Sequence, residues 1–281
     1  MTARFRPYLP TGLVLPVAFC YALAFPPYDL PFLIFPCFIL WFALLERHQH
    51  WRHALKDGLW ISQMITWLSF TWVAYSIRQF GNLPSSLAHA LLVIFGVICQ
   101  PQFWLFPPLA FAIRRVFPER GLKRIMVFAL AYAAFDYGFP KLFVDTAGHA
   151  YYARPWLRQA ADLGGAPLLT FLTVFLSGIL WIWFEGAGRK AHWIPARWRL
   201  LVVEAGSHGP VFLVGAAVFL AWGGYGYFRE KDIRSLTAEA PQSLQLAVIQ
   251  ANIGDFDKIA SESGVGKAAE EILRRYFALS D

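Results

Sequence analysis

The sequence contains seven long apolar blocks, more than the interior of a soluble fold of this size could enclose. A helix needs about 20 apolar residues, within a range of roughly 17–25, to cross the hydrocarbon of a bilayer. Hydrophobic residues make up 57% of the 281 residues and charged residues 15%, which excludes intrinsic disorder and a simple soluble enzyme. We therefore predict an α-helical integral membrane bundle of about seven transmembrane helices. The blocks are residues 9–25, 30–45, 58–77, 86–113, 125–139, 166–184 and 211–227.

Two of these blocks, 30–45 and 125–139, are short, so each is either a full crossing or a re-entrant segment. The block 86–113 is long and contains three prolines, for which a kink or a tilt is expected. These prolines are Pro101, Pro107 and Pro108.

The distribution of basic residues favours seven crossings. If the N-terminus is cytoplasmic, fourteen Lys and Arg residues fall in inner loops and four in outer loops. Cytoplasmic loops of membrane proteins carry such an excess, and the loss of one crossing would invert every later loop. The N-terminus is therefore expected in the cytoplasm and the C-terminal tail on the other side of the membrane. The same loops account for the net charge of +7, so nucleic acid is not an expected partner.

The tail differs in composition from the rest of the chain. Residues 1–228 form the expected transmembrane domain, and the polar segment 229–242 is interpreted as a linker. Residues 243–253 have the pattern of a buried strand, and 267–279 that of an amphipathic helix. A strand followed by a helix opens an α/β domain, but about 40 residues are too few to complete one. Residues 243–281 are therefore expected to be the start of a truncated domain.

Cysteine and histidine give no sign of a metal site or a redox centre. Cys20, Cys37 and Cys99 lie inside apolar blocks, where we expect them to be small buried residues. His48, His50 and His53 cluster in the first inner loop, and we interpret them as a solvated segment near the membrane. No cofactor and no metal is predicted.

An aromatic turn at residues 72–84 is the first candidate site. Two interpretations fit this segment. The first is an interfacial aromatic belt with a Gly/Pro turn, and the second is a lipid-facing rim at the outer leaflet. In the second interpretation Arg78 meets a lipid phosphate and the aromatic rings line an acyl chain. The candidate residues here are Trp72, Tyr75, Arg78, Phe80, Gly81 and Pro84.

The outer loop 141–165 is the second candidate site. Its candidate binding residues are His149, Tyr151, Trp156 and Arg158. Asp145 lies four residues before His149, but the loop has no Ser or Cys nucleophile, so a hydrogen-bonded structural histidine is favoured. Asp136, near the outer end of its block, is either functional or a carboxylate that reaches water.

These motifs together resemble the bacterial apolipoprotein N-acyltransferases. The segment Val248-Ile249-Gln250-Ala251-Asn252-Ile253 is similar to the strand that opens the family's nitrilase-like domain. Residues 72–84 are similar to its aromatic turn, with Asn82 in place of a second glycine. Residues 24–29, 155–159 and 162–165 are similar to its other outer loops.

The resemblance implies a function and a set of partners. The family transfers an acyl chain from a phospholipid to the N-terminal diacylglyceryl-cysteine of lipoproteins, through a thioester on a Glu-Lys-Cys triad. The triad follows the first strand and helix of the nitrilase-like domain, so the 281 residues hold no position for it. We assign no catalytic residue, and this chain alone is expected to be inactive. The expected partners are a phospholipid acyl donor, a diacylglyceryl lipoprotein acceptor and the membrane. The resemblance also implies that the chain lies in the bacterial inner membrane, with its C-terminal tail in the periplasm.

Two alternatives remain open at this point. The chain could be a noncatalytic membrane partner of a separate nitrilase-like protein. It could also be a membrane transporter, although the sequence shows no internal repeat and no set of ionisable residues at the membrane midplane.

Overall fold

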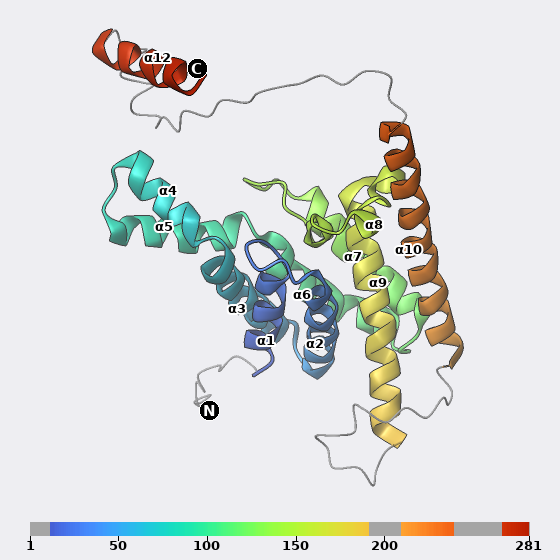
Figure 1. The fold of residues 1–281 in the computed structure, drawn as a ribbon. Helices are drawn as coiled ribbons and strands as arrows, with labels where there is room; N and C mark the ends of the chain where they lie inside the picture. The colour runs from blue at the N-terminus through green and yellow to red at the C-terminus, as the bar shows by residue number, and fades with distance from the viewer. Residues whose placement is uncertain (1–11, 191–208, 239–265, 281) are drawn as a thin grey trace, which may run out of the picture.

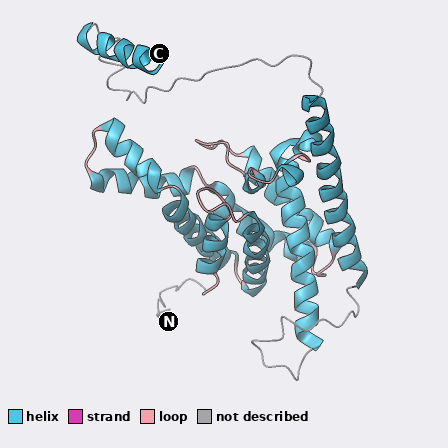
Figure 2. Ribbon diagram, in the orientation of Figure 1, coloured by secondary structure: helices cyan, strands magenta, loops and turns pink. Residues whose placement is uncertain are grey.

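The computed structural model describes residues 12–190, 209–238 and 266–280. Over these residues the protein consists of helices and loops, without a strand (Figures 1 and 2). The helices before residue 100 are α1 (Val14–Leu23), the short 3-10 helix η1 (Pro31–Leu33), α2 (Ile34–Arg47), α3 (Trp51–Ser69), α4 (Thr71–Gly81) and α5 (Ser85–Ile98). The later ones are α6 (Pro101–Val116), α7 (Leu122–Gly138), η2 (Ala147–Tyr151), α8 (Pro155–Arg158), α9 (Ala161–Lys190), α10 (Gly209–Ala238) and α12 (Gly266–Ser280).

Membrane-capable helices are present, as the apolar blocks predicted. In the described part of the chain, three helical segments are long and apolar enough to cross a bilayer. They are Ser85–Val116, which comprises α5 and α6, Ala161–Glu185 within α9, and Gly209–Ala238, which is α10. The other predicted blocks form shorter helices or pairs of helices, so the full set of seven crossings stays a prediction.

Two predicted blocks are interrupted by breaks in the backbone. Phe70, with φ −121° and ψ 18°, separates α3 from α4 inside the block 58–77. Gln100, with φ −125° and ψ 47°, separates α5 from α6 inside the block 86–113. The residue before a proline is disfavoured in the helical region, so the expected kink lies immediately before Pro101. Pro107 and Pro108 lie inside α6.

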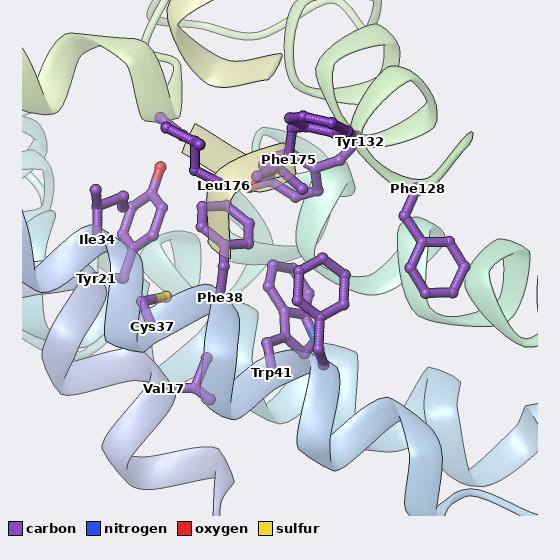
Figure 3. Close-up of a cluster of buried hydrophobic side chains, with 14 of the residues drawn as sticks. Val17, Tyr21, Ile34, Cys37, Phe38, Trp41, Phe128, Tyr132, Phe175 and Leu176 are labelled. Carbon is purple, nitrogen blue, oxygen red and sulfur yellow. The ribbon is translucent and has the colours of Figure 1, made fainter. Parts of the chain in front are cut away.

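Aromatic packing forms the core of the bundle. Figure 3 shows side chains from α1, α2, α7 and α9 meeting in one cluster. Trp41 of α2 packs edge-on against Phe106 of α6 and Tyr132 of α7, with ring centroids 5.7 and 5.6 Å apart. Burial in lipid gives little hydrophobic gain between helices, so such close packing is what holds them together.

Glycines allow the closest helix contacts. A Cβ on Gly58 of α3 would lie 2.6 Å from the Phe103 carbonyl oxygen of α6. A Cβ on Gly226 of α10 would lie 1.5 Å from the carbonyl oxygen of Trp156 in α8. Both helix pairs therefore depend on the absence of a side chain at these positions.

The tail differs in part from the expectation. Helix α10 continues to Ala238, so the first ten residues of the predicted linker 229–242 are helical. An ion pair between Glu230 and Arg234, four residues apart, supports this polar extension. The predicted strand 243–253 lies outside the described residues, and the domain boundaries stay a prediction.

The amphipathic helix predicted at 267–279 is confirmed as α12. Two ion pairs lie within this helix, from Arg274 and from Arg275 to the carboxylate of Glu271. Hydrogen bonds from these two guanidinium groups lower the pKa of Glu271 to about 2, so its carboxylate is charged at neutral pH.

Candidate functional site

A buried ion pair fixes the 141–165 segment to the end of the bundle. Asp136, the third-last residue of α7, is 1% exposed. Lys141 Nζ donates to its Oδ1 at 3.0 Å, and the Ala147 N–H donates to its Oδ2 at 2.8 Å. Thr170 of α9 donates its hydroxyl proton to the same Oδ2 at 3.1 Å. The carboxylate therefore joins α7, the 141–165 segment and α9.

These contacts decide between the two interpretations of Asp136. Its carboxylate does not reach water, because a cation, a backbone amide and a hydroxyl occupy its oxygens. Buried charges are tolerated when they are paired and hydrogen-bonded in this way. Asp136 positions the 141–165 segment.

Asp145 extends this polar cluster towards the break between α5 and α6. Its backbone carbonyl accepts a hydrogen bond from Lys141 Nζ at 2.6 Å, and its Oδ2 accepts one from Gln100 Nε2 at 3.4 Å. Burial raises the pKa of the Asp145 carboxyl, although Lys141 and Gln100 act in the opposite direction. The loop is thus tied to α7, to α9 and to Gln100, which lies between α5 and α6.

The aromatic turn lies on a projecting pair of helices. We call α4 and α5 together the α4–α5 arm, which extends away from the bundle in Figure 1. Val73 and Ala74 are buried against α5, which leaves the opposite face of α4 free. Trp72, Tyr75 and Phe80 of α4 are each about half exposed. Arg78 is also exposed.

The turn of the arm has the conformation that its sequence suggests. Gly81 ends α4, and Asn82 follows with φ 49° and ψ 37°, in the left-handed region. Asparagine tolerates this region better than other non-glycine residues, which explains how it replaces a glycine here. Pro84 then stands in an extended conformation immediately before α5.

One contact joins the arm to the 141–165 segment. The Trp72 ring lies 5.0 Å from the ring of Phe143, centroid to centroid. Phe143 also lies 6.0 Å from Phe95 of α5. The exposed aromatic face of the arm is therefore continuous with the start of the loop.

The other candidate residues lie towards α9 and α10. His149 Nδ1 accepts a hydrogen bond from the Thr146 N–H at 3.0 Å and caps η2, which confirms the structural interpretation of this histidine. Tyr151 is fully buried and donates to Thr173 Oγ1 at 2.8 Å, because the Thr173 proton is used by the Leu169 carbonyl. Tyr151 therefore offers no open binding group, whereas the His149 side chain is exposed.

Trp156 and Arg158 support the packing of α8. The Trp156 ring lies 3.1 Å from a Cβ built on Gly223 of α10. Arg158 donates to the Tyr152 carbonyl at 2.8 Å and lies over the Tyr152 ring. The ten predicted site residues therefore fall into two groups, one on the α4–α5 arm and one at the α8–α10 side of the loop.

The sequence interpretation missed the residues that fix the 141–165 segment to the helices of the bundle. Lys141 follows Asp136 by five residues, and that spacing was the available signal for the ion pair. Phe143 and Thr170 gave no signal, because their roles depend on helices distant in sequence.

One residue of the histidine cluster differs from its predicted character, whereas His50 and His53 are exposed as predicted. His48 is buried and donates from Nε2 to Asp57 at 2.9 Å, so it is not part of a solvated segment. Across residues 12–190, 209–238 and 266–280 there is no group of three His, Cys, Asp or Glu side chains placed to hold a metal ion. Cys37 is buried as expected, whereas Cys20 and Cys99 are partly exposed.

Long apolar helices, a buried charge pair and glycine-mediated contacts define an α-helical membrane protein. Comparison with known proteins identifies its family. The model of the apolipoprotein N-acyltransferase N-terminal domain matches residues 17–179, and the chain belongs to this family. The apolipoprotein N-acyltransferase of Bdellovibrio bacteriovorus is 27% identical over 263 residues. The match covers 90% of this chain and 42% of that relative, so the chain spans less than half of its length.

Proposed function

We propose that this chain is the membrane part of an apolipoprotein N-acyltransferase, which acylates the N-terminal diacylglyceryl-cysteine of lipoproteins with a chain from a phospholipid. The observation that carries the proposal is the family match over residues 17–179, which include the arm and the 141–165 segment. The match supports acyl transfer as the reaction class. The phospholipid donor and the lipoprotein acceptor are inferred from the resemblance to the family.

In this proposal the α4–α5 arm receives lipid. Trp72, Tyr75 and Phe80 offer a half-exposed aromatic face to an acyl chain, and Arg78 pairs with a phosphate. The loop anchored by Asp136 and Lys141 closes one side of this face through Phe143. The remaining candidate residues hold the loop and α8 in place, and so affect lipid binding indirectly, through the position of the loop. They are His149, Tyr151, Trp156 and Arg158.

The orientation is part of the proposal. The charge distribution supports seven crossings, with the N-terminus in the cytoplasm and the arm, the 141–165 segment and Ala238 on the periplasmic side. Lipoproteins carry their acceptor amine on that side of the inner membrane. Acyl transfer itself is assigned to a nitrilase-like domain that begins near residue 243, and no residue of the membrane part is given a catalytic role.

A lipid-binding experiment tests the role of the arm. Fluorescent phosphatidylethanolamine is titrated into the detergent-solubilised chain and into the variant W72A/Y75A/F80A. Each large apolar side chain contributes about 1.5–3 kcal/mol when it is fully buried, so the variant is expected to bind roughly tenfold or more weakly. The measured quantity is the dissociation constant of the zwitterionic lipid.

The matched control is Trp51→Ala. Trp51 is 50% exposed and Trp72 is 49% exposed, but Trp51 lies at the start of α3, outside the arm. The control is expected to bind as the parent does. Unchanged binding by the triple variant, or an equal loss in the control, would contradict a lipid site on the arm.

A further inference from the structure

A cavity rich in arginine lies at the opposite end of α7 from Asp136. It has a volume of about 520 Å³ and is lined by the C-terminal ends of α2 and α6 and the start of α7. We call it the arginine pocket. Its charged lining residues, His48 apart, are Glu46, Arg47, Arg114, Arg115, Arg120 and Arg124.

The single carboxylate in the pocket does not balance its cations. Three arginines converge on Glu46: Arg114 at 3.6 Å, Arg120 at 3.1 Å and Arg124 at 3.0 Å. Arg120 also pairs with Glu185 of α9, just outside the pocket. Arg47 and Arg115 are exposed at the rim. The lining thus holds five arginines and one glutamate, which leaves a strong positive field.

The burial of Arg124 makes this excess of positive charge energetically costly. Its side chain is 3% exposed and stands in the first turn of α7, where the helix dipole is itself positive. Its Nη2 is buried near Glu46, but among the described residues it has no hydrogen bond of acceptable geometry. A buried cation at a positive helix end, which shares its one nearby carboxylate with Arg114 and Arg120, is a site that a further anion would stabilise.

An apolar cavity continues from the arginine pocket along α2 and α9. It has a volume of about 420 Å³ and shares Glu46, Arg47 and Arg120 with the pocket. The rest of its lining is Ile39, Leu40 and Ala43 on α2 and Trp181, Phe184 and Glu185 on α9, so it is apolar except for Glu185, which pairs with Arg120. A third cavity, of about 410 Å³, follows further along the same two helices beside Phe35 and Leu176. The charged pocket therefore opens into an apolar path between helices.

We propose that the arginine pocket binds the phosphodiester headgroup of an anionic phospholipid whose acyl chains lie along α2 and α9. Arginine matches phosphate oxygens with paired N–H donors, and basic pockets between membrane helices are suited to anionic headgroups. The apolar path selects a lipid over a soluble phosphate, which would have nothing to place there. This site is separate from the α4–α5 arm, and its occupant is a bound lipid, not the acyl donor.

The test uses the full 281-residue chain in an uncharged detergent. Dioleoyl phosphatidylglycerol, dioleoyl phosphatidylcholine and inorganic phosphate are titrated separately, and binding is followed by native mass spectrometry and by the thermal unfolding midpoint. Phosphatidylglycerol is expected to bind roughly tenfold or more tightly than phosphatidylcholine and to raise the midpoint. Equal binding of the two lipids would overturn the proposal. Equal stabilisation by inorganic phosphate would show a soluble-anion site and would overturn it too.

Paired charge variants locate the site. R47Q/R115Q removes two exposed rim cations and is expected to weaken phosphatidylglycerol binding roughly tenfold or more. R52Q/K123Q removes the same charge from exposed positions outside the pocket lining and is expected to leave the affinity within about twofold. An equal loss in both variants would overturn a specific pocket. Phosphatidylethanolamine binding at the arm should be unchanged in R47Q/R115Q, so the two sites are tested separately.

Discussion

Replacing Asp136 by alanine is expected to lower the free energy of unfolding by about 3–5 kcal/mol, because it leaves Lys141 as a buried charge without its partner. The Ala147 amide and the Thr170 hydroxyl lose their acceptor at the same time. The measurement is reversible unfolding in detergent, combined with proteolysis near residues 142–144. The 141–165 segment should become the first site of cleavage.

Two further variants test the origin of this effect. D136A/K141M removes both charges, so it should recover a large part of the lost stability. Asp162→Asn breaks an exposed ion pair with Arg229, which water screens, and should cost much less than Asp136→Ala. If Asp136→Ala costs no more than Asp162→Asn, then the pair does not anchor the loop.

Replacing Gly226 by alanine is expected to cost about 3 kcal/mol and to separate α10 from α8. The added Cβ would lie 1.5 Å from the Trp156 carbonyl oxygen. This is a backbone atom, so the clash cannot be relieved by a change of side-chain rotamer. Overpacking typically costs about 1–3 kcal/mol, and a clash with backbone belongs at the upper end. The neighbouring hydrogen bond from Trp222 Nε1 to the Leu157 carbonyl, 2.8 Å long, should break as the helices move apart.

Gly224 provides the control in the same helix. No atom lies within 4 Å of a Cβ built there, so Gly224→Ala should be neutral or slightly stabilising through its better helix propensity. Unfolding midpoints distinguish the two variants. Equal behaviour of Gly224→Ala and Gly226→Ala would show that α8 and α10 do not pack as described.

Hydropathy predicted the helices better than it predicted their interruptions. An apolar block shows that a segment prefers lipid, but Phe70 and the flanks of Gln100 are as apolar as continuous helix would be. The Pro101 kink was predictable because proline restricts the residue before it. The extension of α10 past Tyr227 was missed, because polar residues in a solvated helix have the composition of a linker.

The candidate site was predictable in its parts but not in its assembly. Trp72, Tyr75 and Phe80 could be singled out from one turn of sequence, and the structure leaves them exposed together. The role of Tyr151 was not predictable, since its hydroxyl meets Thr173 of a helix 22 residues away. The arginine pocket was also hidden, because its cations come from two inner loops, each of which looks ordinary by itself.

Labelling of single cysteines in whole cells tests the account most directly. Cys20, Cys37 and Cys99 are first replaced by alanine, and one cysteine is then introduced at Val144, at Leu236 or at Val116, which are 75%, 66% and 71% exposed. A membrane-impermeant maleimide should label positions 144 and 236 in intact spheroplasts, and position 116 only after the membrane is opened. Labelling of position 116 in intact spheroplasts, with 144 and 236 protected, would show that the arm and the loop face the cytoplasm and would contradict the proposed function.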